Sequence, residues 1–307
     1  MVKRVTVRVP ASSANLGSGF DCVGVALRLH HTLTVEEEEG SGFEIRVSGE
    51  GARAIPVDES NATYKAMTRM FAHTGHSPGR LIVESVNEIP LSAGLGSSAA
   101  SVLAGMAAAA VLSGQEIDWN QLLRLAVDVE GHPDNVAAAL YGGFAVVCRT
   151  GSQSVEHLHV PIPPSLSATV VHPEFTVSTD KSRDALPDSV SFADAVFNVS
   201  RAALLVGAFA TSRTELIQSA MQDRLHQPHR MQLVPGLEEV CQAALDAGAH
   251  GAALSGSGPS VMAFVRKGDS APGARMRAAW AREGVQARVL ELEFDHAGLQ
   301  LLEGITE

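Results

Sequence analysis

The sequence predicts an α+β protein built from two domains. Its 307 residues are long for one domain and comfortable for two. The two halves place their expected strands and helices in different orders, and residues 151–164 between them combine a glycine–serine turn with three prolines. We therefore expect a first domain over residues 1–155 and a second over residues 156–307.

In the first half, alternating apolar residues predict strands, and longer apolar or alanine-rich stretches predict helices. Strands are expected over residues 5–9, 23–29, 32–38, 43–47, 80–86 and 144–148. Helices are expected over residues 62–73, 99–112, 120–130 and 134–141, and glycines end the last two.

The second half has a different order of elements. Strands are expected over residues 168–172, 252–255, 261–265 and 286–292, and helices over residues 192–209, 237–247 and 274–282. The middle two strands are joined by a Gly-Ser-Gly-Pro turn, residues 256–259. This order is close to a split βαβ arrangement with extra helices in the middle.

Composition narrows the class of protein. The chain carries 23 basic and 34 acidic residues, a net charge of −11, which repels nucleic acid and anionic membranes, so neither partner is expected. Three widely spaced cysteines favour a reducing compartment over a disulfide framework or structural zinc. The chain starts with an expected strand, and its longest apolar run is far shorter than the ~20 residues of a membrane span. We expect a soluble, cytoplasmic protein.

The most informative segment is glycine-rich and leads into an alanine-rich helix. Gly94 and Gly96 let the backbone adopt positive φ and approach a ligand closely. Ser97 and Ser98 follow at the position where hydroxyls cap a helix. The first turn of a helix presents unpaired N–H groups and about half a positive charge. The segment is therefore expected to hold an anion such as phosphate.

Two other nucleotide-binding motifs fit this segment poorly. A P-loop requires a lysine after its second glycine, and none lies between Lys65 and Lys181. The Gly-x-Gly-x-x-Ala pattern ending at Ala99 matches a dinucleotide fold, but residues 89–92 separate it from the preceding strand, and no second strand with a ribose-binding acid follows. From this segment alone, a plain connection between strand and helix stays open.

Other polar side chains could carry chemistry. Asn15 and Asp21, in the loop after the first strand, either meet a substrate amine or hydroxyl or only cap the loop backbone. Glu130 ends a helix, where the dipole disfavours a carboxylate unless a cation such as Mg²⁺ compensates it. His132 is either a polar ligand contact or a capped loop residue, and Asp134 is most simply an N-cap.

Two arginines form the last constellation. Arg183 lies four residues after Thr179, and Arg230 lies in a His-Gln-Pro-His-Arg segment. Paired arginines bind carboxylates through charge-assisted hydrogen bonds, although each arginine alone is more typical of a solvated surface charge.

Three segments taken together resemble the signatures of the GHMP kinases, the superfamily of galactokinase, homoserine kinase, mevalonate kinase and phosphomevalonate kinase. They are residues 10–21, residues 90–100, which resemble the ATP loop, and residues 251–260. Within that superfamily, residues 15–21, 130–135, 178–183 and 228–230 resemble the homoserine kinases, with His229 where a tyrosine is common. The resemblance implies an N-terminal domain of the ribosomal protein S5 domain 2-like type and a ferredoxin-like C-terminal domain.

The resemblance also implies the site residues. The ATP-binding set would be Pro90, Leu91, Ser92, Ala93, Gly94, Leu95, Gly96, Ser97, Ser98, Ala99 and Ala100, with Gly256 and Gly258 from the third segment. Ser98 and Glu130 would hold Mg²⁺. The homoserine-binding set would be Asn15, Asp21, His132, Thr179, Arg183 and Arg230, and Asp21 would also orient the reacting hydroxyl.

The activity implied is transfer of the γ-phosphoryl group of Mg-ATP to the side-chain hydroxyl of L-homoserine, a step toward threonine, by an enzyme that is a homodimer. Thr179 and the two arginines favour an α-amino acid. Two alternatives remain: a kinase for another small alcohol, such as shikimate or a mevalonate derivative, and a catalytically silent relative that binds nucleotide.

Overall fold

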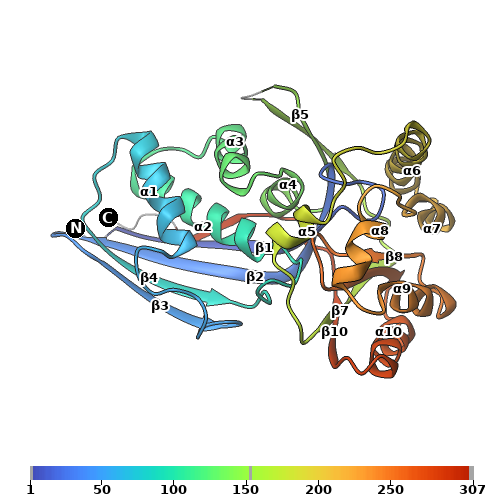
Figure 1. Cartoon of the computed structure of the whole chain (residues 1–307). Coiled ribbons are helices and arrows are strands. Elements are labelled where there is room, and N and C mark those ends of the chain that lie inside the picture. The colour runs from blue at the N-terminus through green and yellow to red at the C-terminus, as the bar shows by residue number, and fades with distance from the viewer. Residues whose placement is uncertain (1–2, 152–153, 304–307) are drawn as a thin grey trace.

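The computed structural model describes residues 3–151 and 154–303, and these form two sheets with helices packed on them (Figure 1). The first sheet has the strand order β11-β1-β2-β4-β3. In addition, β5 pairs with β2 on one side and with β6 on the other. Its strands are β1 (Lys3–Ala14), β2 (Val23–Glu38), β3 (Phe43–Gly49), β4 (Arg80–Asn87), β5 (Phe144–Arg149), β6 (Val155–Val160) and β11 (Gln300–Glu303). All of these pairings are antiparallel except that of β3 with β4.

Four helices cover one face of the first sheet (Figure 1). They are α1 (Ala62–Thr74), α2 (Ser97–Leu112), α3 (Trp119–Glu130) and α4 (Asp134–Tyr141). α2 is buried on nearly every side, as its alanine-rich sequence requires. Gly105 in its middle lets α1 approach closely, because a Cβ there would lie 2.5 Å from the carbonyl oxygen of Thr63.

The second sheet is antiparallel, with the order β10-β7-β9-β8. Its strands are β7 (Leu166–Pro173), β8 (Gly251–Leu254), β9 (Val261–Arg266) and β10 (Ala287–Leu292). The helices of this half are α5 (Thr179–Asp184), α6 (Phe192–Ala210), α7 (Ile217–Ala220), α8 (Gln227–Arg230), α9 (Leu237–Asp246) and α10 (Ala271–Arg282), with short 3-10 turns η1 (Thr214–Leu216) and η2 (Met231–Leu233). A second core cluster centred on Trp280 lies between this sheet and α9 and α10.

Several elements differ from the sequence expectations. The two strands expected over residues 23–38 are one continuous strand, β2, because His30 and His31 stay paired with β1 and His31 also pairs with β4. A register shift in β1 at Pro10/Ala11 lies opposite this stretch of β2. The helix expected from residue 274 starts at Ala271, with a proline at its second position, where proline is well tolerated.

Two strands were not expected from the sequence, β6 and β11, and both belong to the first sheet although they come late in the chain. β6 begins at Val155, where the expected domain division lies, and β11 returns from the second half to pair with β1. The division into residues 1–155 and 156–307 stays a prediction.

Helix α6 is long and apolar enough to cross a membrane by length and composition, which the sequence analysis did not anticipate. Such a match is weak evidence, since core helices of proteins outside membranes pass the same test. One side of α6 is buried, with Asn198, Leu205 and Phe209 facing inward. Its outer side exposes Phe192, with 85% of its surface accessible, and Val199, with 70%.

Candidate active site

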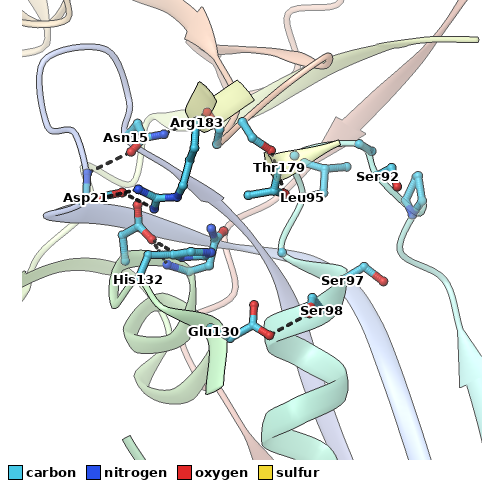
Figure 2. A pocket seen from close by; sticks show the side chains of 18 of the residues that line it. Asn15, Asp21, Ser92, Leu95, Ser97, Ser98, Glu130, His132, Thr179 and Arg183 are labelled. Atoms are coloured by element: carbon cyan, nitrogen blue, oxygen red, sulfur yellow. Dashed lines mark hydrogen bonds and ion pairs between the residues drawn. The ribbon is translucent and has the colours of Figure 1, made fainter. Parts of the chain in front are cut away.

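A cavity of about 170 Å³ lies where loops from both sheets meet, and it gathers most of the site residues expected from the sequence (Figure 2). Expected residues that line it are Asn15, Asp21, Pro90, Ser92, Ala93, Gly94, Leu95, Gly96, Ser97, Ser98, Glu130, His132, Thr179, Arg183, Arg230 and Gly256. Leu91, Ala99, Ala100 and Gly258 are not among its lining residues. Asp134, Asn135 and Ser257 also line it, although the expected set left them out.

The glycine-rich loop leaves the N-terminus of α2 open toward the cavity. Gly94 and Gly96 have φ of 73° and 68°, as their expected role requires. The expected cap by Ser97 or Ser98 is wrong: Gly96 is the N-cap, no side chain bonds to it, and both serines belong to the first helical turn. No acidic residue lies in that turn. The free N–H groups and the positive end of the helix dipole are therefore available to an anion.

Serines from two segments, the end of β1 and the turn after β8, hold this loop in place. The Ser12 backbone N–H donates to the Leu95 carbonyl at 3.0 Å. The Ser255 hydroxyl donates to the Gly94 carbonyl at 2.7 Å and lies 2.8 Å from the Ser13 hydroxyl. Since the Ser255 proton is used toward Gly94, Ser13 donates to Ser255. Sequence reasoning missed these serines because nothing in their spacing reveals partners more than 80 residues away.

Ser98 and Glu130 meet at the edge of the cavity (Figure 2). The Ser98 hydroxyl donates to Glu130 Oε1 at 2.7 Å. Burial raises the pKa of Glu130, while the bond from Ser98 and the charge of His132 oppose this rise. A buried carboxylate beside a hydroxyl is an oxygen donor set of the kind Mg²⁺ uses, and a cation would offset the burial of the charge. The two residues fit the expected metal.

His132 and Asp134 form a pair beside Glu130. Nδ1 of His132 lies 3.0 Å from Oδ1 of Asp134. Burial disfavours the charged imidazole, but the bond and the charge of Asp134, together with Glu130, outweigh it and raise the pKa of His132. Asp134 is not the N-cap of α4, because Pro133 holds that position. Oδ1 of Asp134 nevertheless accepts from the backbone N–H of Asn135 in the first turn, at 2.8 Å, as well as facing His132.

Asp21 and Arg183 form an ion pair in the cavity (Figure 2). Nη2 and Nη1 of Arg183 lie 3.0 Å and 3.2 Å from Oδ1 and Oδ2 of Asp21, a two-bond arrangement. Asp21 has a φ of 55°, held by the bond from its backbone N–H to Oδ1 of Asn15. The carboxylate of Asp21 and the guanidinium of Arg183, both expected to bind substrate, thus compensate each other's charge.

Arg230 reaches the same cavity from α8 and is only 2% exposed. Its Nε donates to the Ser182 carbonyl at 3.1 Å, and its Nη1 donates to the Gly256 carbonyl at 3.1 Å. Burial, with a smaller effect of Arg183, lowers the pKa of Arg230 to about 10, so the side chain stays charged at neutral pH. Its guanidinium also lies over the Phe20 ring, 5.3 Å from the ring centre.

The Gly256 carbonyl joins the first and third glycine-containing segments. It accepts from Nδ2 of Asn15 at 2.8 Å as well as from Arg230, and the Gly256 N–H donates to the Ala14 carbonyl. Both the nitrogen and the oxygen of the Asn15 amide therefore bond to backbone groups. This agrees with one of its two expected roles, capping of the loop backbone. Thr179 begins α5, and its hydroxyl lies 3.4 Å from that of Ser257.

A buried polar cluster behind Arg230 was missed by sequence reasoning. His226 is fully buried, and its Nε2 lies 2.8 Å from the Gly17 carbonyl and its Nδ1 lies 3.2 Å from Nη1 of Arg230. Asp223 accepts from the backbone N–H groups of residues 225, 226 and 227 and from Nδ2 of Asn198. The signal was present in the polar Asp223–Arg230 segment, but only the fold shows that it is buried.

A second cavity, of about 290 Å³, adjoins the first and shares Ser92, Ser97 and Ser98 with it. Its walls include apolar residues from the segment before α1, from the first position of α1 and from the glycine-rich loop: Ala54, Ile55, Pro56, Ala62 and Leu91. A ligand lying over the start of α2 would therefore have space on both sides of the helix terminus.

Comparison with known proteins agrees with this architecture. Residues 61–143 match the model of the GHMP kinases N terminal domain, and residues 205–286 match that of the GHMP kinases C terminal domain. A homoserine kinase of Moorella thermoacetica is 45% identical over 286 residues, covering 93% of this chain and 96% of that protein. One of Microchaete diplosiphon is 40% identical over 303 residues, with 98% of both covered.

A solved structure described as homoserine kinase from Cytophaga hutchinsonii superposes with a TM-score of 0.88 at 31% identity, over 97% of each chain. A mevalonate diphosphate decarboxylase from Staphylococcus aureus, at 15% identity, has a TM-score of 0.70 and shares the fold alone. The expected two-domain α+β fold of the GHMP kinases is confirmed. The chain belongs to the homoserine kinase family of the GHMP kinase superfamily.

Proposed function

We propose that this enzyme transfers the γ-phosphoryl group of ATP to the side-chain hydroxyl of L-homoserine, forming O-phospho-L-homoserine and ADP. The observation that carries the proposal is one cavity in which the open N-terminus of α2 faces Asp21, Arg183 and Arg230. An anion-binding helix terminus and a carboxylate with two arginines in one space suit a phosphate donor and an amino-acid acceptor. Membership of the homoserine kinase family supports the same substrates.

In this proposal the glycine-rich loop and the first turn of α2 bind the triphosphate. Phosphoryl transfer asks the protein mainly for positioning and charge stabilisation. Ser98 and Glu130 would hold Mg²⁺, which, when bound, neutralises charge on the phosphate oxygens. The second cavity, with its apolar walls, would take the nucleoside.

We assign the positively charged arginines of the cavity to the carboxylate of the amino-acid substrate. Arg230 is fixed by the backbone and keeps its charge, so it would bind the substrate carboxylate together with Arg183 and Thr179. Asn15 and His132 would border the remaining polar groups of homoserine. Binding of the substrate carboxylate by Arg183 would release Asp21, which then accepts a hydrogen bond from the reacting hydroxyl. The hydroxyl oxygen bonds to the γ-phosphorus as the bond to the β-phosphate oxygen breaks, and the hydroxyl proton passes to Asp21.

The first experiment is a coupled ADP-release assay with Mg-ATP and, separately, L-homoserine, L-serine, mevalonate and shikimate. Turnover confined to L-homoserine is expected. Turnover with mevalonate or shikimate instead would retain the ATP site and reject the arginine pair as a carboxylate clamp. ATP binding with no turnover on any of the four would favour the catalytically silent relative.

The finer expectations on assembly and location belong to the same proposal. We propose a cytoplasmic homodimer that binds neither nucleic acid nor membrane. The exposed apolar side chains of α6, Phe192, Val196 and Val199, support association through that helix. Sedimentation equilibrium of the full chain tests the dimer, and a mass equal to one chain at micromolar protein would reject it.

A further inference from the structure

A chain of three polar side chains lies under the second cavity. Nε2 of His31, on β2, lies 3.0 Å from the hydroxyl oxygen of Ser85, on β4. Nδ1 of His31 lies 3.3 Å from the hydroxyl oxygen of Ser101, on α2, and Ser101 in turn donates to the Ser97 carbonyl at 3.0 Å. His31 and Ser85 are only 2% and 5% exposed, and His31, Ser85 and Ser101 all line the cavity.

The direction of each hydrogen bond follows from counting protons. A carbonyl oxygen can only accept, so the single hydroxyl proton of Ser101 is used toward Ser97. Ser101 must then accept from Nδ1–H of His31. Burial lowers the pKa of His31 to about 4, so the ring is neutral at pH 7 and carries no second proton on Nε2. Ser85 therefore donates its proton to Nε2 of His31.

The opposite direction satisfies fewer groups. If Ser101 donated to His31, its bond to the Ser97 carbonyl would be lost. Nε2–H of His31 would then donate to Ser85, whose own hydroxyl proton has no other hydrogen-bond acceptor among residues 3–151 and 154–303. Buried polar groups in proteins are nearly always paired, which favours the first arrangement.

In the first arrangement Ser85 offers only oxygen lone pairs to the cavity. Asn61 and Asn87 also line the cavity, but their amides are used within the loops: Nδ2 of Asn61 donates to the Pro56 carbonyl and Nδ2 of Asn87 donates to the Ile89 carbonyl. The hydroxyls of Thr63, Ser92, Ser97 and Ser98 also line the cavity, and the other lining residues are apolar. A buried acceptor beside apolar walls suits a flat ring that carries an N–H donor.

We propose that Ser85, held as an acceptor by His31, selects a nucleotide whose base carries an exocyclic amino group, a 6-aminopurine, over one with a keto oxygen at that position. Ser85 is then a specificity-determining residue, and His31 and Ser101 are positioning residues. The inference rests on the proposed use of a nucleotide as phosphoryl donor. It is consistent with the serines shared by the two cavities, since a nucleotide with its phosphates at α2 reaches the second cavity.

The test measures binding rather than turnover, by calorimetry on the full chain with Mg²⁺ and no homoserine. The probes are ATP, inosine triphosphate, which has a keto oxygen at C6, and purine riboside triphosphate, which has no group there. We expect the wild type to bind ATP about tenfold tighter than either analogue. This factor corresponds to the hydrogen bond that Ser85 makes to the amino group of ATP and leaves unmade with the analogues. In Ser85→Ala the three dissociation constants should fall within about twofold of one another.

Ser48→Ala is the matched control, because it removes a hydroxyl on the neighbouring strand β3 that does not line the cavity. That hydroxyl bonds to the Ser85 backbone carbonyl, at 3.5 Å, and not to the Ser85 side chain. Its preference for ATP should equal that of the wild type. ATP preference that survives in Ser85→Ala, or tighter binding of inosine triphosphate by the wild type, overturns the inference while leaving nucleotide binding intact. Failure of the wild type to bind any of the three nucleotides would instead overturn the proposed function.

A second measurement does not depend on any variant at Ser85. In protein labelled with ¹⁵N-histidine, long-range ¹H–¹⁵N spectra at pH 7 distinguish the two neutral tautomers of each ring. The His31 signal, assigned by its loss in His31→Gln, should show the proton on Nδ1. A proton on Nε2, or on both nitrogens, would overturn the inference.

Discussion

Arg183 and Asp21 hold each other through two hydrogen bonds across the interior of the cavity, at 3.0 Å and 3.2 Å. Their side chains are 39% and 35% exposed, so solvent screens the pair and it contributes little to the stability of the fold. An ion pair of this kind costs little to open. In the proposed mechanism it keeps both charges compensated until the carboxylate and the hydroxyl of the substrate replace the two partners.

Asp21→Asn should lower kcat by roughly a hundredfold or more, the usual range for loss of a group that accepts the reacting proton. The Michaelis constant for ATP should change only slightly, because we assign Asp21 to the amino acid and not to the nucleotide. Steady-state kinetics test this, with Asp194→Asn as control, since Asp194 pairs with Arg224 on the surface of α6. A near-normal kcat would remove Asp21 from the chemistry.

Arg183→Ala and Arg230→Ala should both raise the Michaelis constant for homoserine by about tenfold or more, since each removes a charge-assisted bond. Their stabilities should differ. Arg230 is buried and bonds two backbone carbonyls, so its loss should cost about 1–3 kcal/mol of unfolding free energy, whereas loss of half-exposed Arg183 should cost less than about 0.5 kcal/mol. Urea unfolding measures this, and unchanged homoserine saturation in both variants would refute the clamp.

His226→Phe should weaken homoserine binding without removing any group from the cavity wall. The variant keeps a ring that can stack on Phe20, 5.0 Å away between ring centres, but loses the contacts to Arg230 and to the Gly17 carbonyl. We expect a several-fold rise in the Michaelis constant for homoserine. In a double-mutant cycle, the variant with both His226→Phe and Arg230→Ala should show little more than the effect of Arg230→Ala alone. Additive effects would show that His226 does not act through Arg230.

Gly94→Ala should abolish saturation with ATP. Gly94 has a φ of 73°, and a Cβ there would clash with the Ser255 carbonyl oxygen, so the loop would have to move. Gly114→Ala is the matched control, because Gly114 has a φ of 70° but open space around the added Cβ. The control should lose about 1 kcal/mol of stability from backbone strain and keep its activity. Equal kinetics for the two variants would show that the loop tolerates displacement.

The stability of the protein should fall between pH 7 and pH 5, and His31 should account for about 2 kcal/mol of the loss. The pKa of folded His31 is about 4, against an ordinary value of 6.5. In the unfolded chain His31 therefore takes up a proton below pH 6.5, whereas in the folded protein it stays neutral down to about pH 4. Because only the unfolded state gains this proton between pH 6.5 and pH 4, lowering the pH through this range favours unfolding. Urea unfolding of His31→Gln should show a correspondingly smaller difference between the two pH values, while His73→Gln, at an exposed position, should match the wild type.

Local sequence patterns predicted the elements that carry the site, because they depend on neighbours along the chain. The glycine-rich loop, α2 and the helix ending at Glu130 all follow from short-range composition. The strand β6 was missed because most of its side chains are exposed and show no apolar alternation. β11 was missed because its Gln-Leu-Leu-Glu sequence does not alternate apolar and polar residues.

Partners across the chain could not be predicted. Asp21 and Arg183 are 162 residues apart, and the bond between Ser13 and Ser255 spans 242 residues. Spacing in the sequence carries no information on which polar groups meet over such distances. Asp134 was expected as a helix cap, and it does accept from the Asn135 N–H, but its contact with His132 was not expected. The sequence also gave no sign that His226 is buried.

The pairing of β11 with β1 has a consequence for synthesis on the ribosome. The edge of the first sheet beside β1 has its partner only after residues 300–303 have emerged. Until then, one of the earliest strands made presents unpaired N–H and C=O groups along that edge. The nascent first half is thus exposed to pairing with other chains for most of translation. Fragments that end before β11 should accordingly be prone to aggregation, even when they contain every residue of the glycine-rich loop.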